Sequence, residues 1–170
     1  MPASDRREPG ARFRMGSLNH VHLVVPDRAL AARWYSDVLG FDPVPEFDFW
    51  ATGIDGGPLQ MSADDGQTMI ALFEASEGHA TDARGAEAAF SVDAATFASF
   101  ARSLPDERIA SRSGDPLVAG DVIDFDLCWA FDLADPWGHV HELNCFDYEV
   151  VRRDLIDGDD ISPVRYWTAR

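Results

Sequence analysis

The sequence predicts an α+β protein built from two tandem modules, each with a strand, a helix and three further strands. The first observation is that one strand–helix plan occurs at 20–39 and again, 67 residues later, at 87–104. The second is that short apolar stretches separated by Gly, Pro and Asp follow each helix, as is typical of strands. A sheet of this size cannot bury its apolar face alone, so we expect the two βαβββ modules to pack together.

The first predicted strand, at 20–25, has two unlike faces. Its apolar residues alternate with histidines, so one face is apolar and the other carries the imidazoles of His20 and His22. A helix is predicted at 28–39, because an Asp precedes it as an N-cap and a Gly follows it. The apolar stripe predicted for this helix consists of Leu30, Trp34 and Val38.

The second module repeats this plan with different polar residues. When its strand at 87–92 is overlaid on the first strand, Glu87 takes the position of His20, and a helix is predicted at 94–104. In the last predicted strand, Glu142 matches Ala71 of the first module. The remaining strands are predicted at 41–46, 48–54 and 68–73 in the first module and at 117–124, 126–133 and 139–146 in the second.

The chain divides into four predicted parts. They are a disordered tail at 1–17, modules at 18–78 and 79–146, and a C-terminal extension at 147–170 that packs on the fold. No run of about 18 apolar residues exists that could span a membrane. The first residues lack the apolar stretch of a secretory signal, so we expect a cytoplasmic protein without a membrane partner.

The charge is unusual, because 30 acidic residues stand against 14 arginines and no lysine, which gives a net charge of -16. Molar salt would screen this self-repulsion, since the Debye length falls to about 3 Å at 1 M. We therefore predict a halophilic protein whose melting temperature rises between low salt and molar KCl. The alternative is an ordinary acidic protein from a GC-rich genome, and in either case nucleic acid is excluded as a partner for want of a basic patch.

Three stretches together resemble the vicinal oxygen chelate superfamily, which includes glyoxalase I, the bleomycin and fosfomycin resistance proteins, methylmalonyl-CoA epimerase and the extradiol dioxygenases. They are LNHVHLVVPD, WYSDVLGF and ADPWGHVHEL, and the resemblance covers about residues 18 to 146. It implies two modules whose sheets curl into a half-open barrel around a divalent metal. It also implies a homodimer that acts on a small-molecule substrate.

The resemblance implies a metal site when its ligand positions are carried over one at a time. The family's ligand position on the first strand corresponds to His20, the one on the fifth strand to Glu87, and the one on the last strand to Glu142. Its ligand position on the fourth strand holds Ala71. One imidazole and two carboxylates are a plausible set for Mn, Fe(II), Ni or Zn. Such an ion would act as a Lewis acid that chelates neighbouring oxygens of the substrate.

His22 should point to the same side as His20, where it could be a general base, an alternative ligand or a hydrogen-bonded structural histidine. The leading prediction is a metal-dependent lyase or dioxygenase with His22 as the catalytic residue. The alternative is a metal-free binding protein of the bleomycin-resistance kind, in which His20, Glu87 and Glu142 form only a polar cluster. Three such groups converging without a cation would be costly, which favours the enzyme.

Overall fold

The computed structural model describes residues 17–76, 87–104 and 109–165. Its first sheet has the strand order β1-β4-β3-β2, in which β1 and β4 are parallel and the other pairs are antiparallel. The elements of this module are β1 (His20–Val25), α1 (Arg28–Leu39), β2 (Asp42–Pro43), η1 (Pro45–Phe47), α2 (Asp48–Gly53), β3 (Leu59–Ser62) and β4 (Met69–Glu74).

The second sheet has the order β10-β7-β8-β9-β5, with β6 also paired to β8. Its parallel pair β5·β9 corresponds to β1·β4 of the first sheet. Its elements are β5 (Glu87–Ser91), α3 (Ala94–Ser103), β6 (Ala110–Ser111), η2 (Ala119–Asp121), β7 (Ile123–Asp124), β8 (Trp129–Ala134), β9 (Val140–Cys145), α4 (Tyr148–Val151), η3 (Arg152–Ile156) and β10 (Val164–Arg165). The predicted α+β class with two mixed sheets is thus confirmed.

The internal repeat is visible in the strand registers. In the first module His22 pairs with Ala71, and in the second Ala89 pairs with Glu142. The overlay made from the sequence therefore places Ala71 and Glu142 at equivalent positions of equivalent strands. Both helices also begin as expected, because Asp27 and Asp93 each accept a hydrogen bond from a backbone N–H of the first turn.

The strand predicted at 48–54 is wrong, since these residues form α2, and the strand of this region lies later, at Leu59–Ser62. A contact from a distant residue accounts for the helix. Arg28 donates from Nη2 to the carbonyl oxygen of Ala51 at 3.0 Å and from Nη1 to that of Gly57. The first bond satisfies a carbonyl group of the last helical turn, which has no partner within the helix, and the second binds the turn that follows.

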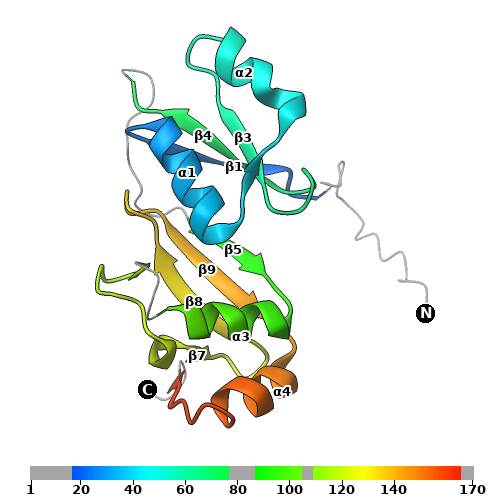
Figure 1. Cartoon of the computed structure of the whole chain (residues 1–170), viewed down its shortest axis with the longest axis vertical. Coiled ribbons are helices and arrows are strands. Elements are labelled where there is room, and N and C mark those ends of the chain that lie inside the picture. The colour runs from blue at the N-terminus through cyan, green and yellow to red at the C-terminus, as the bar shows by residue number, and fades with distance from the viewer. Residues whose placement is uncertain (1–16, 77–86, 105–108, 166–170) are drawn as a thin grey trace, which may run out of the picture.

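Helix α1 contacts both modules, and Figure 1 shows it between the first sheet and the strands β9 and β5. Ala31 and Tyr35 are fully buried in the core of the first module, Val38 packs against the core of the second, and Trp34 packs against both. The predicted stripe is therefore only partly right, because its third member, Leu30, is 48% exposed.

Each sheet has one face covered by its own helix and one face turned away from it. We call the face of the first sheet opposite α1 the histidine face, since strand alternation places His20 and His22 there while Leu23 is in the core. We call the face of the second sheet opposite α3 the carboxylate face, where Glu142 and Asp132 are paired across β9 and β8. The two faces carry the predicted site residues.

The segment after β9 packs on the second module. Val151, Leu155 and Ile156 are buried in its core beside residues of α3. The predicted tail at 1–17 lies outside the described residues except for residue 17. Among the described residues, no helix is both long and apolar enough to cross a membrane.

Candidate functional site

His20 is held by the residue that precedes it. Its Nδ1 lies 2.7 Å from Oδ1 of Asn19. An amide oxygen can only accept a hydrogen bond, so Nδ1 of His20 carries the proton and donates it. The other ring nitrogen, Nε2, is left with its lone pair, which is the state of a histidine that binds a metal.

His22 lies beside His20 on the histidine face. Its Nε2 is 3.0 Å from Nε2 of His20, and the two rings are stacked with centroids 4.9 Å apart. The ring of Phe73 contacts His22 from the neighbouring strand, with centroids 4.8 Å apart. The sequence prediction that His20 and His22 point to the same side thus agrees with the structure.

Ala71 and Gln60 follow His22 across the strands of this face. Ala71 pairs with His22, so a methyl group lies at the position that was predicted from the resemblance to lack a ligand. Ala71 also pairs with Gln60 of β3, which is 1% exposed and whose Oε1 has no hydrogen-bond partner among the described residues. Sequence reasoning missed Gln60, because it placed the strand of this region too early in the chain.

Glu142 is oriented by an amide in the same way as His20. Asn144, two residues later on β9, donates from Nδ2 to Oε1 of Glu142 at 3.0 Å. Asn144 is 9% exposed, and its Oδ1 is buried without a partner among the described residues. The spacing of two residues on a strand places both side chains on the carboxylate face, a signal already present in the sequence.

Glu87 forms an ion pair with an arginine side chain, Arg112, which the sequence pattern did not indicate. Arg112 donates from Nη1 and Nη2 to the two oxygens of Glu87, at 2.6 and 2.9 Å. It also donates from Nε to Asp132 at 3.1 Å. The hydrogen bonds from Arg112 hold the pKa of Glu87 below its usual value. Arg112 thus bridges two carboxylates of the carboxylate face.

A thiol lies near Glu142, but it is not a metal ligand in its present state. Burial raises the pKa of Cys128, and the negative charge of Glu142 raises it further. With its pKa raised in this way, the thiol of Cys128 stays protonated at neutral pH.

A buried hydrogen-bond network joins the two modules. Tyr35 of α1 donates to Oδ2 of Asp135 at 2.8 Å, and its oxygen lies 2.9 Å from Nε2 of His141. His139 lies 2.7 Å from the same oxygen of Asp135. Burial, followed by the nearby Asp135, raises the pKa of Tyr35, so its hydroxyl stays protonated. His139 and His141 are both buried in this network.

Within one chain, the predicted ligands do not meet. Across residues 17–76, 87–104 and 109–165, no three His, Cys, Asp or Glu side chains are grouped as they would be around a metal ion. His20 and His22 lie together on one module, and Glu142 and Glu87 lie on the other. The network around Tyr35 ties the modules together in this arrangement.

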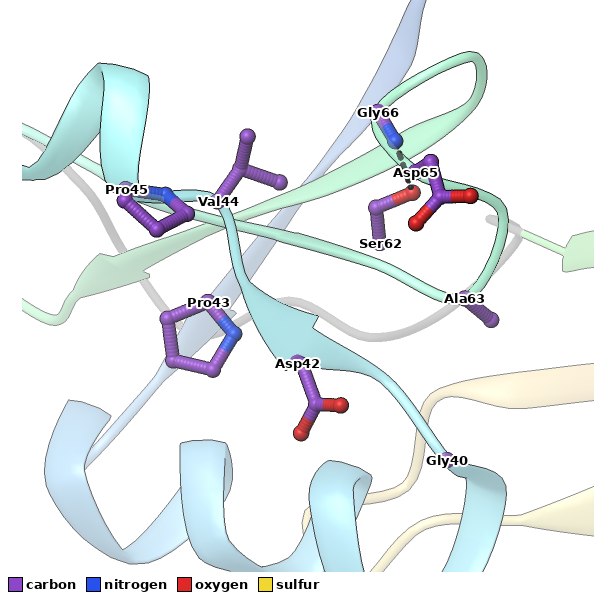
Figure 2. A pocket seen from close by; sticks show the side chains of 9 residues that line it. All are labelled: Gly40, Asp42, Pro43, Val44, Pro45, Ser62, Ala63, Asp65 and Gly66. Atoms are coloured by element: carbon purple, nitrogen blue, oxygen red, sulfur yellow. Dashed lines mark hydrogen bonds between the residues drawn. The ribbon is translucent and has the colours of Figure 1, made fainter.

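Two pockets are lined by residues other than His20, His22, Glu87 and Glu142. The first, of about 330 Å³, lies beside the turn between β3 and β4, where Figure 2 shows Gly66 donating from its backbone nitrogen to Oγ of Ser62. None of the predicted site residues lines it. The second, of about 400 Å³, lies between the modules. It is lined by Leu39, Phe41, Ala63, Asp64, Thr68, Ala89, Phe90, Ser91, Val92 and Leu143.

Solved structures of similar fold come from several bacteria. A glyoxalase/dioxygenase from Nostoc punctiforme has a TM-score of 0.56 and 21% identity over 82% of this chain and 97% of its own. The antibiotic binding protein TnmS3 from Streptomyces sp. CB03234 has a TM-score of 0.54 and 17% identity, covering 78% and 98%. The fosfomycin resistance protein FosX from Mesorhizobium loti has a TM-score of 0.52 and 15% identity, covering 78% and 93%. At these identities the likeness shows the fold alone.

No curated protein matches the sequence. The family model of the Glyoxalase/Bleomycin resistance protein/Dioxygenase superfamily, however, matches residues 17–143, most of the chain. The match contains His20, Glu142 and all but the last residues of the internal repeat. With its paired βαβββ modules and this match, the chain belongs to the glyoxalase/bleomycin resistance protein/dioxygenase superfamily.

Proposed function

We propose that this protein is a metal-dependent enzyme that acts on a small molecule with two neighbouring oxygens. The observation that carries the proposal is that an amide orients each of two ligands. Asn19 leaves Nε2 of His20 with a lone pair, and Asn144 binds one oxygen of Glu142 and leaves Oε2 without a hydrogen bond among the described contacts. Such second contacts to ligands are the usual support of a metal centre.

The residues fit a divalent ion of the Mn, Fe, Ni or Zn group, because these ions accept mixed imidazole and carboxylate ligands. When bound, the ion would supply a Lewis acid for the oxygens of the substrate. The polar side chains around it would position that substrate. Gln60 is the candidate on the histidine face, since its buried amide oxygen has no described partner and would accept a hydrogen bond.

We further propose that the site forms between two copies of the chain, with the histidine face of one against the carboxylate face of the other. Two ligand groups that stay apart in one chain can meet in this way. Each half-site also has an exposed apolar neighbour, Leu18 before His20 and Phe146 after Asn144, both 64% exposed. In the proposed interface these two apolar side chains would be covered by the second copy.

Glu87 remains the predicted third ligand in this proposal. Both of its oxygens bind Arg112, so Arg112 would have to release at least one of them.

Mixing two inactive variants tests the shared site. His20→Ala and Glu142→Ala should each fail to retain an ion through purification, whether as monomers or as dimers, because each lacks one ligand of the complete site. A dimer of one copy of each should regain one intact site, since the intact His20 and Glu142 come from different copies. We expect light scattering to show a dimer, and elemental analysis to show one ion per mixed dimer.

Two outcomes would contradict the proposal. A monomer that retains a stoichiometric ion through purification, without added metal, would place the whole site in one chain. Mixed dimers as empty as the parent variants, formed from a wild type that does bind metal, would rule out sharing between copies.

One observation favours the alternative, a metal-free binding protein. The pocket of about 400 Å³ between the modules is large enough for a small ligand and is lined mainly by apolar side chains, including Phe41 and Phe90. If this is the functional site, metal-stripped protein should be stabilised by apolar aromatic compounds, and His20→Ala should leave that thermal shift unchanged.

A further inference from the structure

We propose that His20 and His22 bind one metal ion together, as a chelate of two ring nitrogens on a single strand. This assigns His22 as a second ligand beside His20, whereas the leading sequence prediction made it the catalytic residue. The inference rests on the proposed metal centre for its function, but the chelate is complete in one chain and can be tested without the dimer.

The distance between the two nitrogens supports the chelate. Nε2 of His20 and Nε2 of His22 are 3.0 Å apart. Ring nitrogens bind zinc at about 2.0–2.1 Å, so two of them at an angle of about 90–110° around one ion lie about 3–3.4 Å apart. The pair therefore already has nearly the separation that a shared ion requires.

The backbone holds the pair in place. Residues two apart on a strand point to the same face, and β1 is fixed by its parallel pairing with β4 along its whole length. The ring of Phe73 packs against that of His22. Little side-chain movement is thus needed to bring both nitrogens to an ion.

The positions of the protons on the two rings are also compatible with an ion between the two Nε2 atoms. Because Asn19 fixes the proton of His20 on Nδ1, the hydrogen bond between the two rings must use the proton on Nε2 of His22. An ion would take the place of that proton between the nitrogens once His22 adopts the tautomer with its proton on Nδ1. Asn19 acts here as a positioning residue, because it keeps the lone pair of His20 directed toward His22.

The chemistry of the pair indicates which ions it selects. The chain carries 30 carboxylates, which offer Mg²⁺ and Ca²⁺ many weak oxygen ligands. Two imidazoles instead favour Zn²⁺, Ni²⁺, Cu²⁺ or Fe²⁺. Joined by Glu142 of a second copy, the pair would give a set of two histidines and one carboxylate with open positions for substrate.

The test is a zinc titration of metal-stripped protein with ¹⁵N-labelled histidine, followed by NMR. We expect the Nε2 signals of His20 and His22 to shift together and to saturate at one ion, while those of His139 and His141, which are buried in the network around Tyr35, stay in place. His20→Gln and His22→Gln should each weaken zinc binding by at least about tenfold.

Asn19 supplies the matched pair of variants. Asn19→Ala should weaken zinc binding by about tenfold, as loss of an orienting partner does, whereas Asn19→Asp keeps an acceptor oxygen and should retain the affinity. Circular dichroism would check that each variant folds.

The outcomes separate this inference from the proposed function. If His22 neither shifts nor matters for affinity while His20 does, the chelate is refuted and the shared centre still stands. If both histidines shift but Glu142→Ala changes neither metal content nor dimerisation, the chelate stands and the shared centre fails. If neither histidine responds to zinc, the chelate is refuted.

Discussion

Single residues decide which carboxylates are open to a metal. Glu87 and Glu142 both lie on the carboxylate face, but Glu87 is bound at both oxygens by Arg112, whereas Glu142 is bound at one oxygen by the neutral amide of Asn144. An arginine competes with a metal for the same lone pairs, while an amide on the second oxygen orients the first. The two carboxylates are therefore not equivalent, although the sequence presents them alike.

Replacing Arg112 with Ala should change the titration of Glu87. Its pKa is held low chiefly by the hydrogen bonds from Arg112, so Arg112→Ala should raise it toward the usual value for glutamate. Carboxyl NMR over a pH series would measure this. Arg102→Ala, which breaks an exposed ion pair with Asp159 elsewhere, should leave the pKa of Glu87 unchanged.

If Glu87 is a third ligand, the Arg112→Ala variant should also retain metal more tightly, and weaker retention would count against that role.

At the scale of elements, helix α2 shows how a tertiary contact overrides a local pattern. A strand is predicted at 48–54 because these residues belong to a series of short stretches separated by Gly, Pro and Asp, yet 48–53 form a helix that ends against a tight turn. Arg28 binds carbonyls of both the helix and the turn, and the backbone of Gly57 approaches that of Trp50 closely. A short helix of this kind is stabilised from outside rather than by its own propensity.

Gly57 should accordingly tolerate no side chain. A Cβ there would lie 1.9 Å from the carbonyl oxygen of Trp50, so α2 or the turn would have to move. We expect Gly57→Ala to lower the free energy of unfolding by about 1–3 kcal/mol, measured by urea denaturation. Gly53→Ala is the matched control, since a Cβ at that position meets nothing within 4 Å. An equal, small effect of both substitutions would show that the close approach has no energetic role.

For the whole molecule, the network around Tyr35 is the main polar link between the modules. Burial lowers the pKa of His141 to about 4, and the neighbouring Asp135 only partly offsets this. The folded protein thus keeps His141 neutral, while the unfolded chain binds a proton below about pH 6.5. Stability from this group is present above that pH and is lost as the pH falls from about 6.5 to 4.

The loss should amount to about 3 kcal/mol when complete, because one pKa unit corresponds to about 1.4 kcal/mol. Urea midpoints measured between pH 7 and 4 would follow it. His141→Gln can still donate to Tyr35 but does not titrate, so its stability should vary less with pH over this range. A variant with the same slope as the wild type would show that other groups cause the acid sensitivity.

The sequence by itself determined the two modules, the equivalence of Ala71 and Glu142, and the placement of His20 and His22 on one strand face. These features depend on the alternation of side chains and on helix caps, which are local properties of the chain. The pairing of Glu87 with Arg112, the helix at 48–53 and the separation of the histidine face from the carboxylate face were decided only by the tertiary structure. Each depends on residues that are distant in the sequence, and no local pattern records which of many acidic side chains an arginine will reach or how one module will lie against the other.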